Sequence, residues 1–206
     1  MIKKILEYLH ELWYSIFKIK SGAMSMKNEK INHDIIENSY YMIDLFKKEK
    51  MNKEVSITNL KLQKLMYFVE AYYMVDNPEE KELFSSSWSA WDYGPVNRKL
   101  YNYYKKFGSM EIVLESSQVL IGNHLPDANK KYIERIYSLF ADFSAFDLVT
   151  LTHLKGSPWD EIFEKNKKFE QYNFQILNDS EIDKLKTKEW FSSQFSFLFQ
   201  KGKEEE

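Results

Sequence analysis

The chain has no cysteine, and its 206 residues include only 6 glycines and 4 prolines. Without cysteine the protein forms no disulfide bond, has no thiol nucleophile and offers no thiolate to zinc, which agrees with a reducing, cytoplasmic location. Few glycines and prolines favour long regular elements over loops. No apolar run approaches the ~20 residues that a membrane-spanning helix needs. We therefore expect a cytoplasmic protein built mainly from regular elements.

The chain also has no excess of positive charge. Its formal net charge is -2 and its isoelectric point is about 6.2. Short lysine clusters such as Lys47-Lys48 and Lys105-Lys106 stand among acidic residues or at expected helix ends. A nucleic-acid-binding domain would usually gather a basic excess on one face. We interpret these clusters as solvated helix faces and expect no binding to nucleic acid.

Recognisable patterns for catalysis or metal binding are absent as well. The chain contains no HExxH arrangement, no glycine-rich phosphate loop and no GxSxG nucleophile motif. We therefore predict no catalytic residue, no metal and no cofactor, although a hydrolase or transferase with an unrecognised site remains an alternative. The four histidines are far apart in the sequence: His10, His33, His124 and His153.

Apolar residues make up 44% of the chain and aromatic residues 17%, which is ample for a core.

An amphipathic pattern at residues 2–19 predicts a helix, and small residues at 21–25 predict a linker after it. This helix has three interpretations: it packs on the main domain, it is an arm for a specific partner, or it lies on a membrane surface. Few cations and two acids disfavour the membrane. We expect an extension at 1–25, a domain at 26–190 and a C-terminal tail at 191–206.

The most apolar helical pattern follows Thr58, whose hydroxyl is a predicted N-cap, and continues to about Val75. Apolar residues recur there at spacings of three and four, and further apolar residues widen this stripe until it covers most of the helix surface. The pattern predicts a central buried helix. A second helix is predicted before it, from about residue 33 to residue 50. Further helix start signals stand at Pro126, at Ser144, at Ser157 and at residues 178–181.

Residues 83–93 are the best candidate for a strand, because three serines disfavour a helix and the next residues alternate in character. We expect Gly94 to stop this strand and Pro95 to be the first residue of the next helix. The β-prone pieces at 111–114 and 119–121 would complete a sheet. The predicted fold class is therefore α+β, predominantly α-helical, with a central buried helix and a small antiparallel β-sheet.

The turn after this strand carries the candidate contact residues. Asp92 either accepts amide hydrogen bonds from the turn and the next helix, or forms an exposed charged pair with Arg98. The aromatic residues around it belong either to the core or to a binding surface, and alternation along a strand would send Trp88 and Trp91 to opposite faces.

Several separated motifs stand in order along the chain. They lie at residues 35–45, 58–68, 84, 90–96, 100–101, 107–108, 144–148, 151–153 and 158–159. Taken together they resemble the SocA-like antitoxin domain, also called the Panacea domain, over roughly residues 33–165. The segment 1–25 and the pair Asn97-Arg98 depart from the usual pattern of the family.

This resemblance implies a bacterial or prophage-encoded antitoxin without catalytic residues. Members of the family neutralise unrelated toxins, usually by direct protein contact, and one relative delivers its toxin to a protease. We therefore expect a cognate toxin as the partner. The alternative is a phage or prophage adaptor or inhibitor that binds a host protein, including delivery to a protease. The candidate partner-binding residues are Trp13, Phe17, Trp88, Trp91, Asp92, Tyr93, Arg98 and Tyr101.

Overall fold

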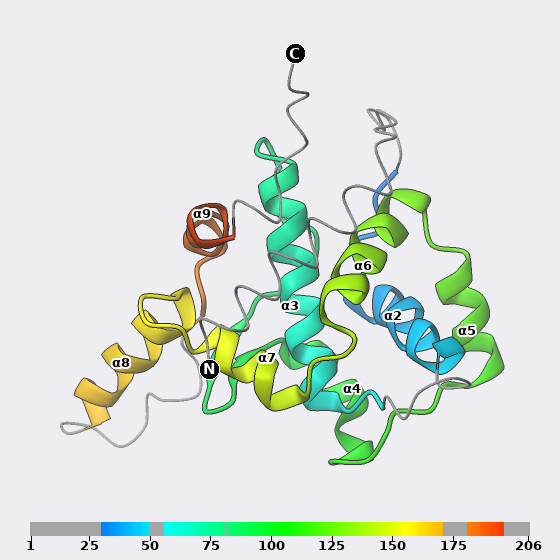
Figure 1. The fold of residues 1–206 in the computed structure, drawn as a ribbon, viewed down its shortest axis with the longest axis horizontal. Coiled ribbons are helices and arrows are strands. Elements are labelled where there is room, and N and C mark those ends of the chain that lie inside the picture. The colour runs from blue at the N-terminus through cyan, green and yellow to red at the C-terminus, as the bar shows by residue number, and fades with distance from the viewer. Residues whose placement is uncertain (1–29, 50–55, 81, 171–180, 196–206) are drawn as a thin grey trace.

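The computed structural model describes residues 30–49, 56–80, 82–170 and 181–195 (Figure 1). The predicted fold class is confirmed, because these residues form mainly helices and one two-stranded antiparallel sheet. The helix predicted at 2–19 and the linker at 21–25 lie outside the described residues. In chain order the elements are α2 (Ile35–Glu49), α3 (Asn59–Asp76), β1 (Ser89–Trp91), β2 (Gly94–Val96), α4 (Arg98–Tyr104), the 3-10 helix η1 (Lys105–Phe107), α5 (Ser116–Asn123), α6 (Asp127–Phe140), α7 (Ala145–Thr152), α8 (Pro158–Glu170) and α9 (Lys184–Gln194).

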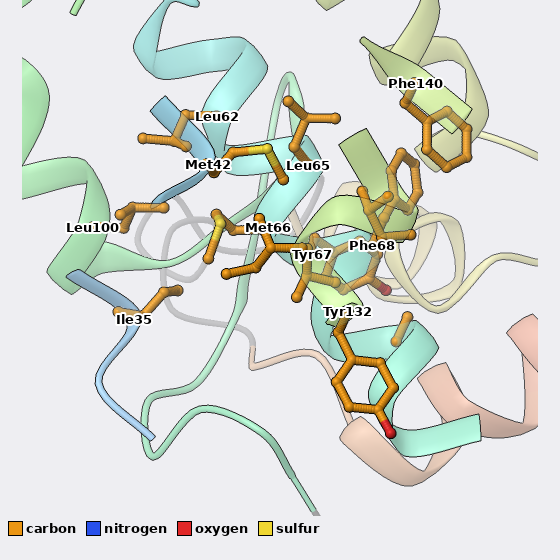
Figure 2. Close-up of a cluster of buried hydrophobic side chains, with 14 of the residues drawn as sticks. Ile35, Met42, Leu62, Leu65, Met66, Tyr67, Phe68, Leu100, Tyr132 and Phe140 are labelled. Carbon is orange, nitrogen blue, oxygen red and sulfur yellow. The ribbon is translucent and has the colours of Figure 1, made fainter. Parts of the chain in front are cut away.

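Helix α3 lies at the centre of the fold, as the sequence predicts. It contacts α2, α4, α6, α7, α9 and β2, and Leu62, Leu65 and Met66 are completely buried (Figure 2). The predicted N-cap is confirmed, since the Thr58 hydroxyl accepts a hydrogen bond from the Lys61 amide at 3.3 Å. Each fully buried aliphatic side chain stabilises the fold by about 1.5–3 kcal/mol. A helix buried on nearly every side can therefore hold the other elements together.

The start signals for α6 and α7 are also confirmed. Helix α6 begins directly after Pro126. Helix α7 begins with a capping box, in which the Ser144 hydroxyl accepts from the Asp147 amide at 3.1 Å and the Asp147 carboxylate accepts from the Ser144 amide at 2.9 Å. These signals work because they act within one turn of helix, where the sequence alone determines the partners.

The last predicted helix start, at residues 178–181, is wrong. Helix α9 begins at Lys184, because the Asp183 carboxylate accepts hydrogen bonds from the amides of Leu185 and Lys186. This carboxylate satisfies two unpaired amides of the first turn, and its negative charge is favourable at the helix N-terminus. Within the predicted stretch only Glu181 is described, and it forms an isolated β-bridge with Ser89.

The strand predicted at 83–93 is too long, and its end is misplaced. Only Ser89–Trp91 is a strand, and Gly94–Val96 is its antiparallel partner rather than a stop signal. Pro95 therefore lies in β2, opposite Ala90, and the next helix begins at Arg98 with Asn97 as its N-cap. Proline fits this position because it has no amide hydrogen to donate. In a two-stranded hairpin, no further strand on the outer side of β2 requires one.

The two β-prone pieces do not extend the sheet. Residues 119–121 lie in helix α5, whose start is fixed by a capping box between Glu115 and Gln118. Of the other piece, Glu111 forms only an isolated bridge with Thr58, and the Ile112 amide donates to the Ile57 carbonyl at 2.9 Å. The N-terminal cap and the packing of α5 against α2 override the β-propensity of the apolar residues.

One buried carboxylate joins α3 to the segment before β1 and to α9. Glu70 is only 1% exposed and accepts hydrogen bonds from the Phe84 amide at 3.1 Å and from the Trp88 indole. The Lys184 ammonium lies 3.1 Å from this carboxylate and 2.6 Å from that of Glu82. Burial raises the pKa of Glu70, and Lys184 and the indole oppose this effect. The charge therefore stays in the core only because several donors surround it.

Replacing Glu70 with leucine should destabilise the protein by about 3–5 kcal/mol, because the buried donors of Phe84 and Trp88 would lose their acceptor. The matched control is Glu82→Leu, which removes the other carboxylate on Lys184. Since Glu82 is 43% exposed, its loss should cost less than about 1 kcal/mol. Urea unfolding of the two variants measures both values. Similar losses in the two variants would contradict the central place given to Glu70.

Candidate functional site

The candidate site is built on the hairpin of β1 and β2. The pairs Ala90↔Pro95 and Trp91↔Gly94 leave a two-residue turn, Asp92-Tyr93. Gly94 has a φ of 93°, which side-chain-bearing residues rarely adopt. An added Cβ there would also lie 2.5 Å from the Thr152 hydroxyl of α7. Glycine is therefore required twice, once for the turn and once so that the hairpin can lie against α7.

Two polar residues of the central helix hold the hairpin from below. Lys64 is completely buried, and its Nζ donates a hydrogen bond to the Pro95 carbonyl at 2.8 Å. Gln63 is equally enclosed, and its Oε1 accepts from the Asn97 amide at 2.9 Å. Burial lowers the pKa of Lys64 from 10.5 to about 7. These contacts explain why polar residues stand in the middle of a buried helix: they bind the backbone of β2 and of the start of α4.

Trp91 anchors the outer side of the hairpin. Its carbonyl accepts a hydrogen bond from the Trp159 indole of α8 at 2.7 Å. Its ring meets that of Tyr101 edge-on at 4.9 Å between centroids, and the Arg98 guanidinium lies over it, 5.9 Å from the centroid. Both latter residues come from α4, so Trp91 links the hairpin to α4 and α8.

Two aromatic side chains beside this anchor face solvent. Tyr93 at the turn is 60% exposed and Phe146 of α7 is 65% exposed. Their ring centroids lie 6.4 Å apart in an edge-on arrangement. An exposed pair of large apolar rings on a well-held turn is typical of a contact surface for another protein. We define the hairpin surface as Trp91, Asp92, Tyr93, Arg98, Tyr101 and Phe146.

Behind the hairpin surface lies a stack of rings. The His153 ring is parallel to that of Trp159 at 3.6 Å between centroids, and Trp159 stacks on Phe163 at 4.4 Å. Burial, with a smaller contribution from Lys64, lowers the pKa of His153 from 6.5 to about 4. An uncharged imidazole can therefore stack closely on the indole, and the stack fixes α8 against the end of α7.

The structure brings most of the predicted contact residues together, but not all of them. Trp91, Asp92, Tyr93, Arg98 and Tyr101 lie on or beside the hairpin, and Asp92 is exposed at its turn. Trp88 instead belongs to the core.

The burial of Trp88 is nearly complete, at 1% exposure. Its ring meets that of Tyr67 edge-on at 5.2 Å. The side chain is therefore enclosed by the fold. Two further predicted contact residues, Trp13 and Phe17, lie outside the described residues.

Phe146 is a candidate contact residue that sequence reasoning missed. The sequence around it predicts a capping box formed by Ser144 and Asp147. That signal gives no role to the apolar residue between them. A usable signal exists, because Leu148 and Leu151 form the buried side of α7 while Phe146 falls off that stripe. A large ring placed off the apolar stripe of a short helix is a candidate for contact.

The described residues contain neither a candidate metal site nor a membrane-spanning helix. No group of three or more histidine, aspartate or glutamate side chains in them could hold a metal ion. Among the same residues, no helix is both long and apolar enough to cross a membrane. What the geometry offers is a surface of aromatic and charged side chains on a rigid support.

Residues 62–160 match the protein family described as "Antitoxin SocA-like, Panacea domain". This segment is a SocA-like Panacea domain. The chain is also 32% identical over 117 residues to "Antitoxin SocA" of Caulobacter vibrioides (strain NA1000 / CB15N), which corresponds to 53% of the chain and 61% of that relative. No solved structure matches the chain. The Panacea domain contains the whole hairpin surface and the polar residues of α3 that support it.

The close approach of Gly94 to α7 can be tested with alanine. Gly94→Ala should destabilise the Panacea domain by about 2–4 kcal/mol, since it combines a strained φ with a steric clash. Gly108→Ala is the matched control: its φ is also positive, at 56°, but an added Cβ would meet nothing within 4 Å. That change keeps the backbone strain but removes the clash, so it should cost about 1–2 kcal/mol, less than Gly94→Ala. Urea unfolding midpoints compare them, and an equal shift would contradict the packing argument.

Proposed function

We propose that the protein is an antitoxin that neutralises a cognate toxin by direct contact, and that the toxin binds at the hairpin surface. The observation that carries this proposal is the exposed pair of Tyr93 and Phe146 within a Panacea domain. The relationship to a protein named as an antitoxin supports the functional class. The surface supports the mode of action, because it offers exposed rings for contact with another protein.

The rigidity of the support favours strong binding. Lys64, Gln63 and Trp159 each hydrogen-bond to the backbone of the hairpin or of the residue that follows it. A turn held at three points loses little conformational freedom when a partner binds, so less of the contact energy is lost to ordering.

The composition of the surface also fits a protein partner. Tyrosine, tryptophan and arginine dominate the energetically important positions of protein interfaces. Trp91, Tyr93, Arg98 and Tyr101 supply these residue types, and Asp92 adds an exposed carboxylate. We propose that the toxin places an apolar side chain on the Tyr93–Phe146 pair and polar groups around it.

Co-expression tests this function. The neighbouring gene is expressed from an inducible promoter with and without the full chain. Growth arrest that the full chain relieves would support the antitoxin role, and purified proteins that co-elute would support direct contact. A toxic neighbour with no rescue would contradict it. Rescue accompanied by loss of the neighbouring protein, seen by immunoblotting, would favour delivery to a protease over simple sequestration.

Removing either exposed ring should weaken this contact without unfolding the domain. Tyr93→Ala and Phe146→Ala should each lower the affinity for the toxin about tenfold or more, because central aromatic contacts contribute about 2 kcal/mol or more. Leu120→Ala on α5 is the matched control, since Leu120 is exposed to a similar extent, at 59%. Calorimetry measures the affinities, and circular dichroism confirms folding. Equal effects at all three positions would exclude the hairpin surface as the contact site.

A further inference from the structure

A lysine is enclosed directly beneath the hairpin surface. Lys64 is completely buried, and its Nζ donates to the Pro95 carbonyl at 2.8 Å. A Cβ added at Gly94 would lie only 3.1 Å from the same Nζ. The amine therefore touches β2 at two successive residues. An ammonium carries three donors and is expensive to bury without several acceptors or a carboxylate.

The charged groups around Lys64 do not offset a positive charge. The titratable group at the end of α7 is its C-cap residue His153, whose charged form Lys64 disfavours. Asp160 of α8 acts on His153. The acids at the start of α7, Asp142 and Asp147, act on Lys61 one turn earlier, whose Nζ donates to the Ala141 carbonyl at 2.6 Å. For Lys64 itself, burial of the amine is the cause of its lowered pKa.

We propose that Lys64 is uncharged when the hairpin is seated on α3, and that its protonation loosens the hairpin and weakens binding at the hairpin surface. The first part follows from the enclosure of the amine. The second part rests on the proposed function, since it concerns the site where the toxin would bind. The central helix of the Panacea domain thus contains a proton-sensitive support for its recognition surface.

The sign of the effect follows from linkage. In the seated hairpin the pKa of Lys64 is about 7, and its ordinary value is 10.5. Seating the hairpin therefore releases a proton between these two values. The equilibrium constant for seating rises about tenfold for each unit of pH from about 7 to about 10.5. Below about pH 7 both states are protonated, and the constant stays at its low level. His153 would act in a separate window, between about 4 and 6.5.

NMR titration of the full chain tests the support without a partner. We expect the Lys64 13Cε signal to titrate near pH 7, and the Gly94 amide signal to follow it with the same midpoint. In Lys64→Met and Lys64→Gln, which cannot titrate there, the Gly94 transition should disappear. A Lys64 midpoint near 10.5, or a Gly94 transition that persists in both variants, would overturn the proposal. A Gly94 midpoint near 4 would assign the effect to His153 and also overturn it.

The affinity for the toxin tests the functional part. Between pH 7 and pH 9 the wild-type chain should gain affinity by about twofold relative to Lys64→Met, in which one titrating proton is absent, because about half of the hairpins are already seated at a midpoint near pH 7. The variant also corrects for groups that titrate on the toxin. Identical pH profiles for the two proteins would overturn the regulatory role. If the NMR transition is present but no toxin binds at any pH, the proposed function fails while the proton-sensitive support stands.

Discussion

The hydrogen bond from Lys64 to the Pro95 carbonyl is the contact on which the arrangement of this domain depends. It joins the most buried helix to the hairpin that faces solvent. A lysine in this position requires a reason, because an amine without a nearby carboxylate costs several kcal/mol to bury as an ion. Remaining uncharged removes most of this cost and keeps a donor for the carbonyl. The neighbouring Gln63 repeats the same solution for the Asn97 amide.

Glu70 shows the opposite solution on the same helix. It lies two turns after Lys64, and it is surrounded by the Phe84 amide, the Trp88 indole and the Lys184 ammonium. Helix α3 therefore holds β2 through an uncharged amine and, two turns later, holds the segment before β1 through a carboxylate. The first contact holds the strand after the turn, and the second holds the residues before the hairpin. The position of the turn is thereby fixed by buried polar groups rather than by apolar packing alone.

Sequence reasoning succeeds where the determining contacts are local. The N-cap of α3 at Thr58 and the capping box at Ser144 each involve residues within one turn, so their pattern predicts them. The sequence does not predict the hairpin correctly, because the hairpin geometry depends on contacts across the fold. Gly94 adopts a positive φ against Thr152, and Pro95 presents its carbonyl to a lysine 31 residues earlier. Nothing adjacent in the sequence indicates either partner.

The same distinction explains why the candidate site was only partly predictable. The spacing of the tryptophans does not indicate which indole donates to a buried carboxylate. Only the position of Glu70 in the fold distinguishes the buried Trp88 from Trp91. Phe146 reaches Tyr93 only because α7 lies beside the turn.

The residues that support the hairpin are separate from the residues that it exposes. Lys64 and Gln63 are enclosed, and they hold β2 and the start of α4 through hydrogen bonds to backbone atoms, so the side chains at the turn do not determine those contacts. Asp92, Tyr93 and Phe146 project into solvent, where substitutions usually change stability by no more than about 0.5 kcal/mol. Residues at the turn can therefore change their chemistry while the turn keeps its position. A scaffold that fixes the backbone from below leaves its outward side chains free to match a partner.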